Sequence, residues 1–235
     1  MHVSFGGCGF LLAFHVGVAK QLQKLGHLTP ASSVAGASGG ALVAAALACD
    51  VPLDAVEERL RQSALLMRSP SRHQSLREYV RAHILELFPS PLPSHLPLTV
   101  ATTQVWPRPG VDFHTTFKSR DDLAEVLLAS CHIPLYLSRD LCVPHRGAWH
   151  IDGCVVSLVP SLPHHVGINV FPLPPFARPS STMISPALIP TRFPFSLQQL
   201  LVWSVVPPHP DVLDELMHWG QVAATAYIAM KTKLT

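Results

Sequence analysis

Charge is scarce in this chain of 235 residues. Asp, Glu, Lys and Arg make up 14% of the sequence, where a typical soluble chain has about 25%. The formal net charge is +2, and Lys and Arg form no basic run. A protein that binds nucleic acid by neutralising phosphates needs such a run or patch, so the sequence argues against a nucleic-acid partner.

Long hydrophobic runs are also missing, although 48% of the residues are hydrophobic and the mean hydropathy is +0.30. No window reaches the roughly 18 to 20 apolar residues required to cross a bilayer. The N-terminus lacks the basic region of a signal peptide. We therefore expect an intracellular, cytoplasmic protein that is not secreted, has no transmembrane span and associates only peripherally with lipid surfaces.

The cysteines give no sign of a disulfide framework or a zinc site. There are five of them, an odd number, and none belongs to a C-x-x-C pair. This usage is typical of reduced intracellular thiols. The five are Cys8, Cys49, Cys131, Cys142 and Cys154.

Strand and helix signals alternate along the chain, whose length is compatible with one domain over residues 1–235. Apolar and β-branched runs predict strands that include residues 2–5, 98–105 and 113–117. Periodicity and capping residues predict helices over residues 11–25, after Pro52, after Ser75, after Ser119 and over about 195–230. Such alternation favours an α/β fold with a mainly parallel sheet covered on both faces.

A segment rich in proline and serine, at about 172–194, separates this pattern from the C-terminal helices. It is predicted to be a surface connection, and the alternative is a mobile lip over an acyl-chain groove. The helix beginning near Ser196 has few polar residues, so it is either buried or exposed to lipid. We interpret Trp203 and Trp219 as core anchors rather than membrane anchors.

The most informative stretch is the sequence GASGG at residues 36–40. A short apolar run ends there and a long Ala/Leu/Val segment of helical composition follows, which predicts a strand, a sharp turn and a helix. Gly36 and Gly40 would support strained backbone angles at Ser38, whose hydroxyl would stand free as a candidate nucleophile. Small residues also cluster where a helix packs closely on a strand, so the motif alone is not decisive.

A glycine-rich loop follows the first strand. It is not a dinucleotide fingerprint, because Leu12 stands where the third glycine is needed. Consecutive backbone amides at Gly7, Cys8 and Gly9 could instead form an anion-binding nest, which beside a serine nucleophile would be an oxyanion hole. The alternative is a tight turn with nothing bound.

A second candidate site is Asp152 with Gly153. An Asp-Gly pair after an apolar run is most often only a turn. A serine hydroxyl, however, needs a base within hydrogen-bond reach, and an aspartate at a strand end can accept its proton directly. Asp152 is therefore the candidate general base.

Four blocks in this order resemble the patatin-like phospholipase family, specifically its adiponutrin and adipose triglyceride lipase branch. They are VSFGGCGFLLAFHVGVA at residues 3–19, AGASGGALVAA at 35–45, SCHIPLYL at 130–137 and IDGC at 151–154. Residues 195–228 are similar to the final helices of that branch. The resemblance implies a three-layer α/β/α domain with a central, mainly parallel sheet.

The resemblance also implies the chemistry. Ser38 would be the nucleophile and Asp152 the general base of a Ser-Asp dyad, with the oxyanion hole in the loop of Gly7, Cys8 and Gly9. The implied enzyme is a lipid acyl hydrolase of triacylglycerol lipase or phospholipase A type, in lipid catabolism and homeostasis. It would form an acyl-enzyme from glycerolipid esters without metal or organic cofactor, at a lipid droplet or membrane surface, with any regulatory protein partner unknown.

Two alternatives remain open. A triad would add a histidine, for which His164, His165, His209 and His218 are candidates. The chain also departs from the family, because Cys154 replaces the second glycine of D-G-G and Leu158 stands where an asparagine before proline is usual. An altered loop would favour a catalytically weak lipid-surface binding protein that regulates an active relative.

Overall fold

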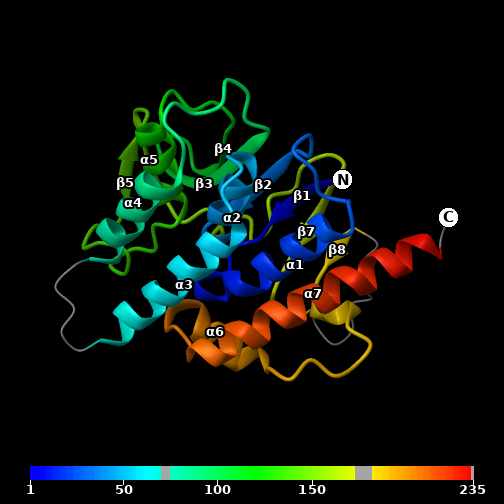
Figure 1. Cartoon of the computed structure of the whole chain (residues 1–235). Helices are drawn as coiled ribbons and strands as arrows, with labels where there is room; N and C mark the ends of the chain where they lie inside the picture. Colours follow the sequence, from blue (N-terminus) through cyan, green and yellow to red (C-terminus); the bar gives the residue numbers. More distant parts are fainter. Residues whose placement is uncertain (70–74, 173–181, 234–235) are drawn as a thin grey trace.

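The computed structural model describes residues 1–69, 75–172 and 182–233, which form an eight-stranded sheet flanked by seven α-helices (Figure 1). This is the α/β/α architecture that the sequence predicts. The strands are β1 (His2–Phe5), β2 (Val34–Ala37), β3 (Leu98–Trp106), β4 (Gly110–His114), β5 (Val143–His145), β6 (Ala148–Ile151), β7 (His165–Ile168) and β8 (Met183–Ile184). The α-helices are α1 (Leu12–Lys24), α2 (Gly39–Ala48), α3 (Leu53–Arg68), α4 (Leu76–Leu87), α5 (Arg120–Ser130), α6 (Leu197–Val205) and α7 (Pro210–Thr232), with short 3-10 helices η1 (Gly9–Leu11) and η2 (Pro186–Leu188).

The sheet is mixed but mostly parallel. Its strand order is β5-β6-β3-β2-β1-β7-β8, and β4 also pairs with β3. The strands from β3 to β8 along this order run parallel, whereas β4, β5 and β6 are joined by antiparallel pairs. The central strands β1 and β2 are almost wholly buried, as expected for a sheet covered on both faces.

The register of three strands brings distant segments to one edge of the sheet. Phe5 on β1 pairs with Gly36 on β2, so the loops that follow these two parallel strands leave the sheet at the same level. β3 is longer than its neighbours and continues beyond this level, and β6 returns along it in the antiparallel direction. The end of β6 therefore arrives beside the end of β2.

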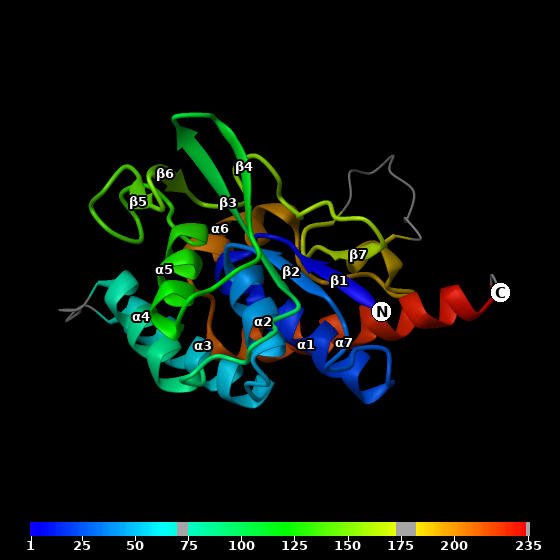
Figure 2. The same cartoon turned by 90° about the horizontal axis from the view of Figure 1, so that it is seen from above.

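The helices near this edge of the sheet include one pair, α1 and α7, whose members are far apart in the sequence but pack against each other. α2 and α5 pack directly on the sheet, while α1 and α7 lie side by side (Figures 1 and 2). A Cβ on Gly17 would lie 2.0 Å from the carbonyl oxygen of Met217, and one on Gly220 would lie 2.1 Å from that of Phe14. The two backbones thus approach as closely as only glycine permits.

The predicted strand at residues 113–117 is placed wrongly. The strand β4 begins at Gly110 and ends at His114, because the turn after Trp106 sets the register of the β3–β4 hairpin. The remaining residues of the predicted strand lead into α5, where the Ser119 side chain caps the helix by accepting the amide of Asp122 at 3.1 Å.

The proline-rich segment is not merely a connection. Residues 173–181 lie outside the described ranges, but β8 adds an edge strand to β7 and η2 packs against α7. Ile184 is fully buried. The C-terminal helices occur where the sequence predicts them, and no helix of the described residues is both long and apolar enough to cross a membrane.

Candidate active site

Ser38 occupies the turn between β2 and α2 in a strained conformation. Its backbone has φ 53° and ψ −132°, a region that residues other than glycine rarely adopt. Gly36 and Gly40, two residues before and after Ser38, allow the turn. A Cβ on Gly36 would lie 2.4 Å from the Gly40 carbonyl oxygen, and one on Gly40 would lie 2.4 Å from that of Gly6. The turn therefore holds Ser38 directly after the end of β2, where its side chain is buried.

The Ser38 hydroxyl donates a hydrogen bond of 2.6 Å to Oδ2 of Asp152. The other carboxylate oxygen, Oδ1, accepts the backbone amide of Cys154 at 2.9 Å. Gly153 passes so close to β3 that a Cβ there would lie 2.1 Å from the Ala101 carbonyl oxygen. The structure thus brings together the two side chains that the sequence singles out, from positions 114 residues apart.

Burial makes Asp152 a stronger proton acceptor than an ordinary aspartate. Its side chain is 1% exposed, and this desolvation raises its pKa, against the lowering effect of the hydrogen bonds from Cys154 and Ser38. A carboxylate with a raised pKa takes a proton from a hydroxyl more readily.

A second serine, Ser130, fixes the backbone of Ser38. The amide of Ser38 donates to Oγ of Ser130 at 2.9 Å, and the Ser130 hydroxyl donates to the Ala101 carbonyl at 2.7 Å. Ser130 therefore links β2, β3 and the end of α5. The sequence assigns it no role, although it lies in the block SCHIPLYL that carries the family resemblance.

The predicted anion-binding loop lies beside the serine but is partly occupied. Gly7 donates its amide to the carbonyl of Leu158 at 2.7 Å. The amides of Cys8 and Gly9 donate no hydrogen bond to other residues that the structure describes. The Cys154 side chain packs on the loop, since a Cβ on Gly7 would lie 2.3 Å from the Cβ of Cys154.

Three cysteines surround the pair, and all three remain thiols near neutral pH. Burial raises the pKa of Cys8, Cys131 and Cys154, and the neighbouring Asp152 carboxylate raises each further. None of them therefore offers a thiolate that would compete with the Ser38 hydroxyl as a nucleophile.

The four histidines considered for a triad take other positions. His165 bonds the Pro163 carbonyl, His209 caps α7, His218 packs on the ring of Trp219, and His164 is exposed. The Ser38 and Asp152 side chains have no hydrogen bond to any of the four. A histidine that the sequence did not single out, His132, interacts electrostatically with Asp152 and donates no side-chain bond to it in the described residues.

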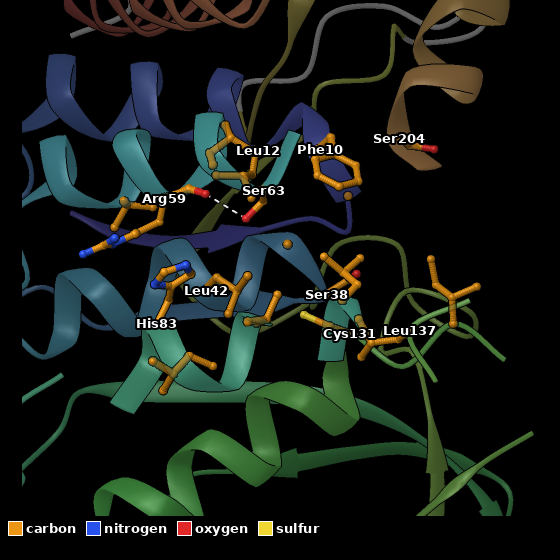
Figure 3. Close-up of a pocket in the computed structure, with 18 of the residues that line it drawn as sticks. Phe10, Leu12, Ser38, Leu42, Arg59, Ser63, His83, Cys131, Leu137 and Ser204 are labelled. Carbon is orange, nitrogen blue, oxygen red and sulfur yellow. Dashed lines mark hydrogen bonds between the residues drawn. The ribbon is translucent and has the colours of Figure 1, made fainter. Parts of the chain in front are cut away.

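An apolar cavity of about 140 Å³ lies beside Ser38 (Figure 3). Ser38, Gly39, Cys131 and Ser204 contribute to its wall near the candidate site. Arg59 and His83 line its other side in this view. Most of the remaining wall is apolar and comes from α1, α2, α3, α4 and the segment after α5, including Leu12, Leu42, Leu60, Ile84 and Leu137.

The comparison with known families decides the classification. The family described as patatin-like phospholipase matches residues 3–163, more than half of the chain. The chain belongs to the patatin-like phospholipase family. This confirms the resemblance predicted from the four sequence blocks.

The chain is similar to several named proteins of this family. The human patatin-like phospholipase domain-containing protein 2 is 30% identical over 93% of this chain and 46% of its own length. Human patatin-like phospholipase domain-containing protein 4 is 31% identical over 73% of this chain and 71% of its own. The human 1-acylglycerol-3-phosphate O-acyltransferase PNPLA3 is 27% identical over 97% and 50%. The chain spans about half the length of several relatives that it matches.

Proposed function

We propose that this chain is a lipid acyl hydrolase that cleaves glycerolipid esters through Ser38 and Asp152. The observation that carries the proposal is the 2.6 Å hydrogen bond between the two side chains at the wall of an apolar cavity. The names of its relatives, which include a phospholipase-like protein and an acyltransferase, support acyl chemistry as the general class.

The proposed reaction has two halves. Asp152 accepts the proton of the Ser38 hydroxyl while Oγ attacks the ester carbonyl, and the free amides of Cys8 and Gly9 stabilise the oxyanion. Protonated Asp152 then returns the proton to the departing alcohol, which leaves the acyl group on Ser38. In the second half Asp152 activates water, which releases a fatty acid, or an acceptor alcohol, which gives acyl transfer.

The proposed substrate class follows from the surroundings of Ser38. The cavity suits an acyl chain because its wall is mostly apolar. Five exposed apolar side chains lie on the segment after α5, on the loop that follows Asp152 and on α6, and are called the apolar rim here: Leu135, Val155, Val156, Leu201 and Val202. Two of these segments meet, since the hydroxyl of Tyr136, next to Leu135, donates to the Val205 carbonyl on α6. We propose that the rim rests on a lipid droplet or membrane surface.

The test compares the protein with two variants on two substrates. We expect wild type to hydrolyse an emulsified glycerolipid and a soluble short-chain ester, and Ser38→Ala and Asp152→Asn to lose both activities by on the order of 10³-fold or more. Ser63→Ala, which alters another serine of the cavity wall, serves as the control. Equal rates in wild type and Ser38→Ala would refute the proposal.

A second candidate is a lipid-surface binding protein that regulates an active relative. The specific observation in its favour is the occupied amide of Gly7, which removes one of three predicted oxyanion donors. Flotation with lipid droplets or vesicles separates the two functions. A pure binder floats with lipid, shows no turnover, and keeps its lipid affinity in Ser38→Ala, whereas the enzyme shows turnover that this variant abolishes.

A further inference from the structure

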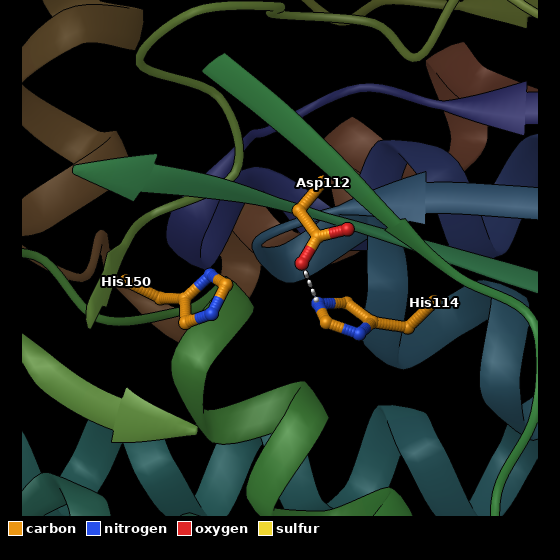
Figure 4. Close-up of side chains that lie close together, drawn as sticks. All are labelled: Asp112, His114 and His150. Atoms are coloured by element: carbon orange, nitrogen blue, oxygen red, sulfur yellow. Dashed lines mark ion pairs between the residues drawn. The ribbon is translucent and has the colours of Figure 1, made fainter. Parts of the chain in front are cut away.

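Two histidines and an aspartate converge on the antiparallel side of the sheet, away from the cavity. Asp112 and His114 lie on β4, and His150 lies on β6, so the three flank β3 from both sides (Figure 4). One potential ligand atom from each lies within 4.8 Å of the others. Asp112 Oδ2 and His114 Nε2 are 3.6 Å apart.

The strand β3 supplies the point on which the rings converge. Thr102 Oγ1 lies 2.9 Å from His114 Nε2 and 2.9 Å from His150 Nδ1. Both ring nitrogens thus point inward to the same place. Ligand atoms around a tetrahedral zinc ion, at bond lengths of roughly 2.0–2.1 Å, lie about 3.3 Å from each other. Small side-chain rotations therefore bring the three groups from their present spacing to zinc coordination.

The environment suits a bound cation. The two histidines are 4% and 1% exposed, whereas the Asp112 side chain is 41% exposed, so an ion has a path in from the surface. The Thr102 hydroxyl can donate to only one of the two inward nitrogens, so the other ring donates to Thr102 and must present its unprotonated form when a cation binds.

Further contacts resemble the supporting layer of a metal site. Burial lowers the pKa of the His150 ring, and the backbone of His145, which interacts electrostatically with that ring, acts in the opposite direction. The His145 ring packs edge-on near both other rings, at centroid distances of 5.4 Å from His114 and 6.1 Å from His150. The three imidazoles thus form one compact group between β4, β5 and β6.

We propose that Asp112, His114 and His150 form a zinc-binding site with water in the fourth position. Two imidazoles, one carboxylate and an open position make a donor set typical of Zn²⁺, whereas Mg²⁺ and Ca²⁺ favour oxygen ligands. The ion would tie β4 to β6 across β3. Because His150 stands two residues before Asp152, this tie would stiffen the strand that delivers the candidate base, without entering the acyl chemistry.

Titration calorimetry on the full chain, after treatment with a chelator, tests the site. We expect one Zn²⁺ per chain, a rise in Tm on adding Zn²⁺, and no response to Mg²⁺. Co²⁺ should give the visible absorption of a tetrahedral complex. Asp112→Asn and His150→Gln should each weaken zinc binding at least tenfold, because the loss even of a contact that supports a metal ligand costs about 10–100-fold in affinity.

Asp112→Asn should fold as wild type does, because the Asp112 side chain is partly exposed. A loss of zinc binding in this variant therefore reports on the site and not on misfolding. His164→Ala, at an exposed histidine outside the cluster, should bind zinc as wild type does. No stoichiometric zinc binding in wild type would overturn the proposal. Equal affinity in wild type, Asp112→Asn and His150→Gln would overturn it as well, by assigning the binding to other histidines.

Discussion

The carbonyl of Leu158 accepts the amide of Gly7 at 2.7 Å. This contact joins the loop after the candidate base to the loop that would stabilise an oxyanion. Leu158 stands where the sequence resemblance implies an asparagine. The anion-binding amides and the loop sequence are therefore coupled through one backbone hydrogen bond.

Leu158→Asn should raise the hydrolysis rate. An asparagine side chain bonds nearby backbone groups and so competes with the arrangement that holds the Leu158 carbonyl on Gly7. Freeing one oxyanion donor is worth on the order of 10²-fold in rate, which we set as the upper limit of the gain. Turnover of a soluble short-chain ester measures it. Leu158→Ala, which removes the side chain without adding an amide, is the control; an equal gain in both variants would contradict the explanation.

Asp152→Asn should stabilise the protein at neutral pH while abolishing turnover. Because burial raises the pKa of Asp152, the carboxyl stabilises the fold below the ordinary aspartate pKa of 3.8, and this contribution is lost as pH rises through the raised pKa. The asparagine variant should have the higher Tm at pH 8, and the difference should shrink near pH 4. The Tm of Asp152→Asn is compared with that of wild type at each pH. If this difference were less favourable to the variant at pH 8 than at pH 4, the buried charge of Asp152 would not destabilise the protein.

The strain at Ser38 predicts that glycine is better tolerated there than alanine. At φ 53° and ψ −132° a side chain costs about 1–3 kcal/mol, which glycine avoids. Ser38→Gly should therefore be more stable than Ser38→Ala by this amount in urea unfolding. Ser63, inside helix α3, is the matched control, where glycine should be less stable than alanine by about 1 kcal/mol. The same order at both positions would rule out strain as the cause.

Filling the cavity should change the preference for acyl-chain length. Leu42→Trp places a large ring in the apolar wall near Ser38. We expect turnover of long-chain esters to fall at least tenfold and turnover of short-chain esters to change less than threefold. Leu65→Trp, at an exposed position of α3, is the control. An equal loss on both ester classes would show that the cavity does not receive the chain.

The sequence predicts much of the fold and the central pair of residues, for identifiable reasons. Strand, turn and helix around Ser38 are encoded locally by glycines and apolar runs, and the family blocks carry the fold class. The hydrogen bonds of Ser130 and of Leu158 depend on strand register and on a backbone carbonyl, which no side-chain pattern reveals. The cluster of Asp112, His114 and His150 is not predicted, because His150 lies on a strand distant in sequence from the other two and the three form no known metal-ligand spacing.

The close pairing of α1 with α7 has a consequence for how the protein is made. The loop with the candidate oxyanion donors leads directly into α1, which is translated well before α7. Its packing partner around Met217 and Gly220 emerges about 200 residues later. During synthesis the apolar face of α1 is therefore uncovered until α7 is translated, and this edge of the sheet can complete its folding only after those further residues have been added. Chaperone binding to the nascent chain should fall sharply once α7 is free to dock.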